Sequence, residues 1–371
     1  MTADVAGAPA QAGAPAPLPT RAVRWRAARD LGLETVQIPL PGPGEVLVAV
    51  AFCGVCGSDL HEIADGPHAI PVDVPHPLSG AVAPITLGHE FSGTVVSSGP
   101  GVTALPPGTP VAVEPNYRCG ACTACREGRY EVCTGFGFAG LMGDGGMADH
   151  ALVPEYMVKP LPDGFDLAAA AVLEPAAVAL HGIRRSTFVP GQQVLVVGLG
   201  AVGLLVCALL RDKGAGVVIG VDPRPSRRAL AARLGADVVL APDDDVAGAV
   251  RDATGGDGVH VAFEVVGAQH TVDAALAGVR AGGELLLLGL VHELRIPAFR
   301  MLNAEQRLTT SVGYRDCHDE LIAMCAEGRL DLAALITDVV ELVDAPDALV
   351  QMATDPGDGI KTLIRCGGSR S

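Results

Sequence analysis

Residues Val194 to Gly203 read VLVVGLGAVG, four aliphatic residues followed at once by glycines in the spacing GxGxxG. A short apolar run is typical of a buried strand, and Ala201 to Lys213 after it has the composition of a helix. A second apolar run, Val217 to Val221, ends at Asp222, 19 residues after the last glycine. In this strand–loop–helix–strand setting, the glycines predict a loop whose backbone approaches the pyrophosphate of a dinucleotide. The residues expected at this cofactor are Gly198, Gly200, Ala201, Val202, Gly203 and Asp222.

The acid at the end of the second strand bears on which dinucleotide binds. A carboxylate at Asp222 accepts the adenosine ribose hydroxyls and repels the additional phosphate of NADP. Arg224, Arg227 and Arg228 follow it, and cations at this place can accept such a phosphate. We predict NAD, with NADP as the alternative, and Arg227 among the residues at the cofactor.

Alternation of apolar runs and helical segments continues downstream as far as residue 313. Runs at 259–265, 284–289 and 308–313 are strand-like, and 274–280 is helical. Crossovers of this length indicate a doubly wound parallel sheet. Beyond Tyr314 the pattern changes to a helix at 317–327 and short segments ending at 362–365, which fit a return to the first part of the chain.

Upstream of the glycine loop, short strands separated by proline and glycine predict a β-rich domain. The fold class is therefore α/β, a β-rich domain plus a doubly wound dinucleotide-binding domain. The domain boundaries we predict are a flexible tail 1–20, a β-rich domain 21–178 containing a lobe 115–137, a dinucleotide-binding domain 179–313 and a return segment 314–371.

Four cysteines lie close together inside that lobe. Their spacing is C-x2-C-x2-C-x7-C in a glycine-rich segment, and four thiolates so placed can close a tetrahedron around zinc. An iron–sulfur cluster is the competing interpretation. We favour zinc, because Thr134 follows the last cysteine where an iron–sulfur pattern usually continues with proline. The predicted ligands of this structural zinc are Cys119, Cys122, Cys125 and Cys133.

A second group of metal-capable residues is dispersed along the chain. Residues 56–61 read CGSDLH and provide a thiol, a hydroxyl, a carboxylate and an imidazole, and His89-Glu90 opens an alternating strand pattern. Glu174, followed by Pro175, lies in the middle of an alanine-rich helical segment, 166–184. A carboxylate there has few solvating neighbours, so it is either in a loop or held by a partner, for which a metal would serve.

Composition excludes several classes of function. The net charge of −16 argues against a nucleic-acid partner, and no apolar run approaches the roughly 20 residues of a membrane span. Residues 1–19 lack the basic start and apolar core of a secretory signal. Clustered cysteines indicate metal binding in a reducing compartment, so we expect a cytoplasmic protein.

Taken in order, these motifs resemble the zinc-dependent medium-chain alcohol dehydrogenase family over nearly all of residues 21–366. Within the family, Glu174-Pro175 resembles the butanediol and polyol dehydrogenase branch. The stretches 75–78 (PHPL), 83–90 (APITLGHE) and 114–119 (EPNYRC) are most similar to (R,R)-2,3-butanediol dehydrogenases. The resemblance implies a GroES-like fold for the β-rich domain, two zinc ions per chain and a homodimer or homotetramer.

The resemblance also implies roles for individual residues. It makes Cys56, His89 and Glu90 ligands of a catalytic zinc, with Glu174 binding directly or through water. Asp59 would orient His89, Ser58 would receive the proton of the alcohol, and His61 would be the outer end of that relay. Lys361 stands where a cation commonly reaches the cofactor pyrophosphate. At Glu174 the sequence departs from the classical members of the family, which have a cysteine there. The resting zinc could therefore have three or four protein ligands.

The expected reaction is hydride transfer between NAD and a small secondary alcohol or its ketone. A vicinal diol or acyloin such as 2,3-butanediol or acetoin is our first expectation for the substrate. The alternative is a sugar alcohol, a cyclitol or a secondary-alcohol intermediate of specialised biosynthesis. An alternative of another class is a non-catalytic, zinc-stabilised nucleotide-binding protein, which the complete set of site residues disfavours.

Overall fold

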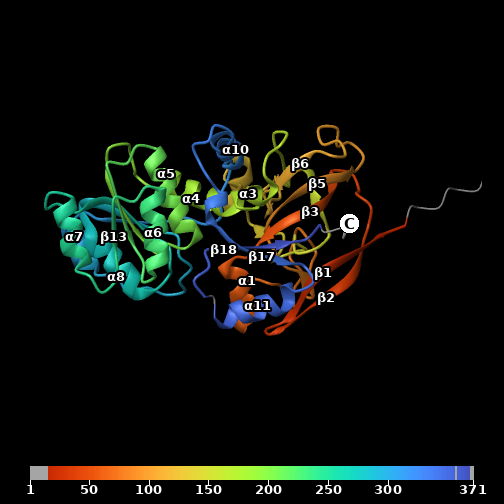
Figure 1. Cartoon of the computed structure of the whole chain (residues 1–371), viewed down its shortest axis with the longest axis horizontal. Helices are drawn as coiled ribbons and strands as arrows, with labels where there is room; N and C mark the ends of the chain where they lie inside the picture. The colour runs from red at the N-terminus through yellow and green to blue at the C-terminus, as the bar shows by residue number, and fades with distance from the viewer. Residues whose placement is uncertain (1–15, 356, 368–371) are drawn as a thin grey trace, which may run out of the picture.

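The computed structural model describes residues 16–355 and 357–367 and has two lobes arranged along its long axis (Figure 1). Most of the predicted tail 1–20 lies outside the described residues. Its last residues, from Leu18 on, already belong to the first strand. The lobe that carries α5 to α8 is separate from the lobe that carries α1, α11 and most of the remaining strands (Figure 1).

The first lobe is built on a six-stranded parallel sheet, which confirms the predicted doubly wound fold. Its strand order is β13-β12-β11-β14-β15-β16, with the glycine loop following the inner strand β11. The strands are β11 (Gln193–Val197), β12 (Val217–Val221), β13 (Val238–Leu240), β14 (Val259–Glu264), β15 (Val279–Leu287) and β16 (Arg307–Thr310). The helices are α5 (Ala201–Asp212), α6 (Pro225–Leu234), α7 (Val246–Ala253), α8 (Gln269–Gly278) and α9 (Ala298–Asn303).

The second lobe is β-rich, as predicted. A seven-stranded sheet has the order β10-β6-β5-β3-β18-β17 with β9 also paired to β3, beside a three-stranded sheet β2-β1-β4 and a two-stranded pair β7-β8. The first strands are β1 (Leu18–Ala27), β2 (Asp30–Ile38), β3 (Glu45–Gly54), β4 (Ile85–Thr86), β5 (Glu90–Ser98) and β6 (Pro110–Val113). The later strands are β7 (Asn116–Tyr117), β8 (Gly137–Phe138), β9 (His150–Pro154), β10 (Val158–Pro160), β17 (Ile336–Glu341) and β18 (Lys361–Arg365). Its helices are α1 (Gly57–Asp65), α2 (Thr123–Arg126), α3 (Leu167–Ala171) and α11 (Ala345–Thr354). Two more helices, α4 (Leu173–Arg185) and α10 (His318–Ala326), pack against each other between the lobes, and α4 also packs against α5 (Figure 1).

The end of the chain packs against its beginning. Strand β18 pairs antiparallel with β3, so that Leu363 lies opposite Gly54, and α11 lies beside α1 (Figure 1). Trp25 in β1 is fully buried, and its indole nitrogen donates to the carbonyl of Glu62 in α1. Among the described residues, no helix is long and apolar enough to cross a membrane.

Two local differences from the sequence expectations affect the site. The predicted helical segment 166–184 is broken at Val172 into α3 and α4, which puts Glu174 in the first turn of α4 instead of mid-helix. Pro175 explains this position, because a residue without an N–H is tolerated at the start of a helix and not inside it. Helix α1, which begins directly after Cys56, is a short helix that the pattern did not reveal.

Candidate active site and metal centres

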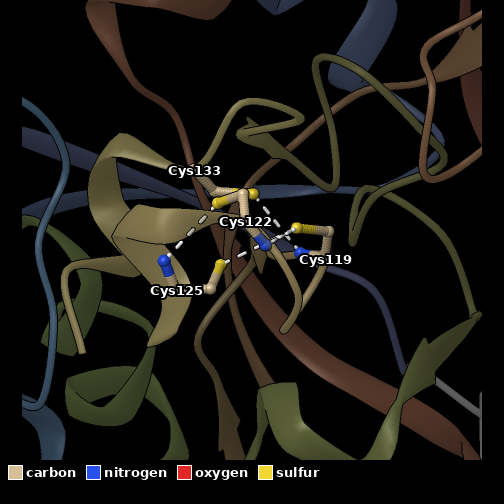
Figure 2. Close-up of side chains that lie close together, drawn as sticks. All are labelled: Cys119, Cys122, Cys125 and Cys133. Atoms are coloured by element: carbon tan, nitrogen blue, oxygen red, sulfur yellow. Dashed lines mark hydrogen bonds between the residues drawn. The ribbon is translucent and has the colours of Figure 1, made fainter. Parts of the chain in front are cut away.

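The four clustered cysteines converge on one point (Figure 2). Their sulfur atoms all lie within 4.8 Å of one another, and Cys119 Sγ is 3.9 Å from Cys125 Sγ. A zinc ion bound tetrahedrally at about 2.3 Å separates its sulfur ligands by about 3.8 Å. The four sulfurs therefore fit a closed zinc site without rearrangement of the backbone.

Backbone N–H groups around these sulfurs favour thiolates. Cys119 Sγ accepts from the N–H groups of Ala121 and Cys122, which lower the pKa of this thiol. The N–H of Cys125 is the first cause that lowers the pKa of Cys122 to about 6. Burial and neighbouring thiols raise the pKa of Cys125 to about 12. Four thiolates repel one another at this distance, and a divalent cation relieves that repulsion.

The second metal-capable group lies in the β-rich lobe, where the start of α1 meets the start of β5. Cys56 is the N-cap of α1, while His89 and Glu90 stand at the start of β5. One donor atom from each of these three residues lies within 4.8 Å of the others. A thiolate, an imidazole and a carboxylate form a donor set that fits zinc and leaves at least one position for another ligand.

Residues of α1 surround this group from one side. The Asp59 carboxylate accepts from the Cys56 N–H at 3.0 Å and lies 3.4 Å from His89 Nδ1, so it can hold the imidazole with Nε2 toward the sulfur. Ser58 Oγ lies 3.4 Å from that Nε2. His61, one turn later on α1, is exposed to solvent. Ser58 and His61 are three residues apart on the helix, so they share a face that runs from the site to water.

Electrostatics at His89 reflect its acidic surroundings. Burial alone lowers the pKa of this imidazole, but the nearby Asp59 and Cys56 raise it well above its ordinary value overall. Asp59 and Glu90 are fully buried, and His89 is nearly so. A positive charge at the position of the imidazole is therefore stabilised, as expected where a metal ion binds.

Glu174 approaches the same place from α4. It lies outside the tight group of three, yet it is 5% exposed and its carboxylate feels the charges of His89, Glu90 and Lys361. Burial is the main reason that the pKa of Glu174 is raised to about 7. The carboxylate thus faces the site at a greater distance than the other donors, which fits contact with a bound zinc either directly or through water.

Lys361, predicted at the cofactor pyrophosphate, contacts Glu90 in this structure. Its Nζ donates to both carboxylate oxygens of Glu90, at 2.8 and 2.7 Å, and to the carbonyl of Val55 at 3.0 Å. These three acceptors account for all three N–H donors of the ammonium group. Its role at the cofactor pyrophosphate stays a prediction, since in this structure the side chain is buried against a predicted zinc ligand.

The glycine loop has the geometry that a pyrophosphate needs. Gly198 has φ of +96°, a conformation that side chains rarely adopt, and a Cβ on Gly203 would lie 1.8 Å from the Gly198 carbonyl oxygen. Gly200 is the N-cap of α5, so Ala201 and Val202 form its first turn and point free N–H groups out of the loop. The backbone of the loop is therefore tightly packed, and the N–H groups at the start of α5 can bind an anion such as a pyrophosphate.

The residues expected near the adenosine ribose lie beside this loop. Asp222 is 4% exposed, and its carboxylate accepts from the backbone N–H groups of Leu199 and Arg224. A guanidinium nitrogen of Arg227 lies 3.9 Å from the carboxylate and the same distance from where a Cβ on Gly200 would stand. The Asp222 carboxylate and the Arg227 guanidinium thus lie close together. This arrangement is compatible with either NAD or NADP.

Sequence reasoning missed two neighbours of the site. The Phe138 ring lies 5.8 Å from the His89 ring, and Phe136 lies edge-on against Phe138 at 5.0 Å. The GFGF stretch 135–138 was a signal, because two aromatic residues stand in an otherwise small-residue loop. The second is the Lys361–Glu90 pair, for which no local pattern exists, as the two residues are 271 positions apart.

Comparison with family models supports both halves of this description. Residues 42–163 match the alcohol dehydrogenase GroES-like domain, and residues 201–327 match the zinc-binding dehydrogenase domain. The chain is similar to (R,R)-butanediol dehydrogenase of Bacillus subtilis, with 37% identity over 93% of this chain and 99% of the relative. It is also similar to sorbitol dehydrogenase of the same organism, with 31% identity over 91% of this chain and 94% of the relative.

Solved structures of dehydrogenases are also similar to this chain. The crystal structure of 2R,3R-butanediol dehydrogenase from Bacillus subtilis matches with a TM-score of 0.87 and 34% identity over 93% of this chain and 99% of that one. A zinc-binding dehydrogenase structure from Sinorhizobium meliloti 1021, bound to NADP, matches with a TM-score of 0.85 and 31% identity over 94% and 99% of the two chains. The chain therefore belongs to the zinc-dependent medium-chain alcohol dehydrogenase family, together with butanediol and polyol dehydrogenases.

Proposed function

We propose that this alcohol dehydrogenase interconverts a small vicinal diol and its acyloin, such as 2,3-butanediol and acetoin, with NAD as the hydride carrier. The observation that carries the proposal is the meeting of Cys56, His89 and Glu90 with Glu174 beside them, in a chain that also has the glycine loop. The similarity to butanediol dehydrogenases directs the choice of substrate.

In the proposed alcohol oxidation, each residue at the site has a separate role. Cys56, His89 and Glu90 would hold a zinc ion, which would supply Lewis acidity for the ionisation of the alcohol. Ser58 accepts the hydroxyl proton, and His61 passes it to solvent from the exposed end of α1. Asp59 holds His89 in its orientation, and the glycine loop would bind the pyrophosphate of the dinucleotide that accepts the hydride.

NAD is the cofactor we propose, because Asp222 directly follows β12 and contacts the glycine loop at the Leu199 N–H, and a carboxylate in that sequence position favours ribose hydroxyls over an additional phosphate. Two zinc ions per chain are part of the proposal, one at the four cysteines and one at the active site. A reducing, cytoplasmic setting belongs to it as well, because thiolate ligands must stay unoxidised.

The experiment that tests the proposal combines metal analysis with turnover on one preparation. We expect about two zinc ions per chain and reduction of NAD, in preference to NADP, with 2,3-butanediol. Sorbitol and xylitol serve as the comparison substrates, because the similarity to sorbitol dehydrogenase favours the second candidate, a polyol. Turnover of the polyols alone would replace the diol assignment, and a preference for NADP would refute the cofactor assignment.

We further propose that the chain is a homodimer or homotetramer. Strand β16 is an edge strand of its sheet, and large apolar side chains nearby are exposed, including Phe299 at 80%, Leu290 at 76% and Leu302 at 72%. Apolar side chains gathered beside an open strand edge favour association with another chain. Light scattering of the purified protein measures the mass directly, and charged substitutions at Phe299 and Leu302 should shift it toward the monomer.

A further inference from the structure

Arg224 reaches from one lobe of the molecule to the other. It is the N-cap of α6, two residues after Asp222, and so belongs to the lobe with the parallel sheet. Its Nη1 donates to the carbonyl of Gly357, and its Nε lies 3.8 Å from the carboxylate of Asp358. Those two residues belong to the loop 357–359, which leads into β18 of the β-rich lobe. A cation at the start of α6 therefore joins the two lobes.

Arg227 makes a second contact with the same loop. Its Nη2 donates to the carbonyl of Gly359 at 3.3 Å, while its Nη1 lies 3.9 Å from the Asp222 carboxylate. The side chains of Arg224 and Arg227 are 29% and 21% exposed, so both contacts are partly shielded from water. Hydrogen bonds from a charged donor are stronger than those from a neutral one. The two guanidinium groups thus fix the loop 357–359 against α6.

The loop 357–359 is also tied to its own lobe. The N–H of Ile360, the next residue, donates to the hydroxyl of Thr337 in β17 at 3.1 Å. Lys361 then opens β18 and donates to both carboxylate oxygens of Glu90. The loop cannot move far without β17 and β18, so its contact with α6 constrains how the two lobes lie relative to each other.

The same contacts bear on the cations that follow Asp222. An arginine at this place could instead bind the additional phosphate of NADP, but Arg224 already donates to a loop carbonyl. Arg228 is engaged within its own turn, where its Nη1 donates to the carbonyls of Asp222 and Pro223 at 2.7 and 2.9 Å. For Arg224 to bind a phosphate, it would have to release the other lobe.

We propose that Arg224 and Arg227 are positioning residues that hold the two lobes together beside the adenosine ribose site, and that Arg224 does not recognise the additional phosphate of NADP. The inference rests on the proposed function in taking a dinucleotide to bind at the glycine loop, with its nicotinamide directed to the metal site of the other lobe. A ligand that spans both lobes binds more tightly when they are already held in place, because less freedom is lost on binding.

Arg224→Gln is the direct test, because it removes the charge from a partly exposed side chain. The readout is the affinity, by calorimetry, for NAD and NADP and for AMP and its 2′-phosphate derivative, so that the members of each pair differ by one phosphate. We expect NAD and NADP to bind about 5- to 10-fold more weakly, by equal factors. AMP and its derivative should keep their affinities, because they do not reach the second lobe. Arg233→Gln removes the same charge from the exposed last turn of α6 and should change none of these values.

Hydrogen exchange of the cofactor-free protein tests the contact itself. The amides of residues 357–361 should exchange faster in Arg224→Gln than in the wild type, and Arg233→Gln should leave them unchanged. A loss of affinity confined to NADP and the 2′-phosphate derivative would overturn the inference, since it would show direct contact with the phosphate. Wild-type exchange in Arg224→Gln, or wild-type affinity for both dinucleotides, would also overturn it.

The failure of this inference and that of the proposed function are distinguishable. A wild-type protein that prefers NADP contradicts the proposed cofactor, whereas equal losses for both dinucleotides in Arg224→Gln would still support the positioning role. A wild type that binds neither dinucleotide contradicts the proposed function, and the exchange measurement then decides whether Arg224 joins the lobes. Folding of each variant is checked by the emission of Trp25, the single tryptophan of the chain.

Discussion

Replacing Lys361 with methionine should show how much the ammonium group stabilises the buried Glu90 carboxylate. The side chain keeps its length but loses its charge, while Glu90 stays fully buried and loses the donor that contacts both of its oxygens. Removing one partner of a buried ion pair costs about 3–5 kcal/mol, chiefly because the other charge is left without compensation. We expect the metal-free Lys361→Met variant to lose stability by about this amount.

The chain has a favourable probe for this measurement. Trp25 is its single tryptophan and lies fully buried in the β-rich lobe, so its fluorescence during urea unfolding follows this lobe alone. The wild type and the variant are compared in chelator and again with zinc. Zinc should return part of the lost stability if Glu90 is a ligand, because the cation replaces the ammonium group as counter-charge.

The double variant Glu90→Gln/Lys361→Met is the matched control. It removes both charges and should recover most of the stability that the single variant loses. A metal-free Lys361→Met protein within about 1 kcal/mol of the wild type would refute the reasoning, since a broken buried pair must cost more. NAD affinity of the same variant tests the predicted pyrophosphate contact, and an unchanged affinity would assign Lys361 to Glu90 alone.

Three further predictions concern other parts of the chain. Burial lowers the pKa of His318 to about 3, below the unfolded value near 6.5, so the unfolded chain takes up the proton first as pH falls. This histidine alone should contribute a loss of about 1.6 kcal/mol between pH 6.5 and 5. Glu174, whose pKa is raised, contributes in the opposite direction, so the measured quantity is the difference in slope between the wild type and His318→Leu in urea titrations, which the exposed His292→Asn should not show. Cys133→Ser should lower the zinc content by one ion per chain and reduce thermal stability; unchanged metal content would contradict the four-cysteine site. Gly203→Ala, whose Cβ would meet the Gly198 carbonyl at 1.8 Å, should weaken NAD binding about tenfold or more with zinc content unchanged, as measured by calorimetry.

Much of the fold was predictable because its signals are local. The strand at 217–221 is observed with the predicted bounds, and the helix predicted at 201–213 ends one residue earlier, at Asp212. The four cysteines lie within 15 residues, so their spacing alone predicts convergence, and their sulfurs do meet. Periodicity and spacing are effective where one segment contains the whole pattern.

The remaining features depend on contacts between distant segments. The position of Glu174 at a helix start depends on one proline, and composition alone placed it in mid-helix. The pairing of Lys361 with Glu90 joins residues that are 271 positions apart in sequence. A lone lysine or tyrosine in an apolar stretch gives no indication of its partner, because burial is decided by tertiary packing.

The charges at the active site explain why so many segments meet there. Asp59 and Glu90 are fully buried and Glu174 nearly so, and Cys56 adds a thiol, while Lys361 is the buried cation in direct contact with one of these acids. Acidic groups enclosed at this density repel one another strongly, and raising the pKa of Glu174 to about 7 relieves only part of that repulsion. A fold would not retain such an arrangement for stability, because apolar residues of similar volume pack there at lower cost. The excess of buried negative charge fits a divalent cation bound at Cys56, His89 and Glu90, with Lys361 balancing part of the charge on Glu90.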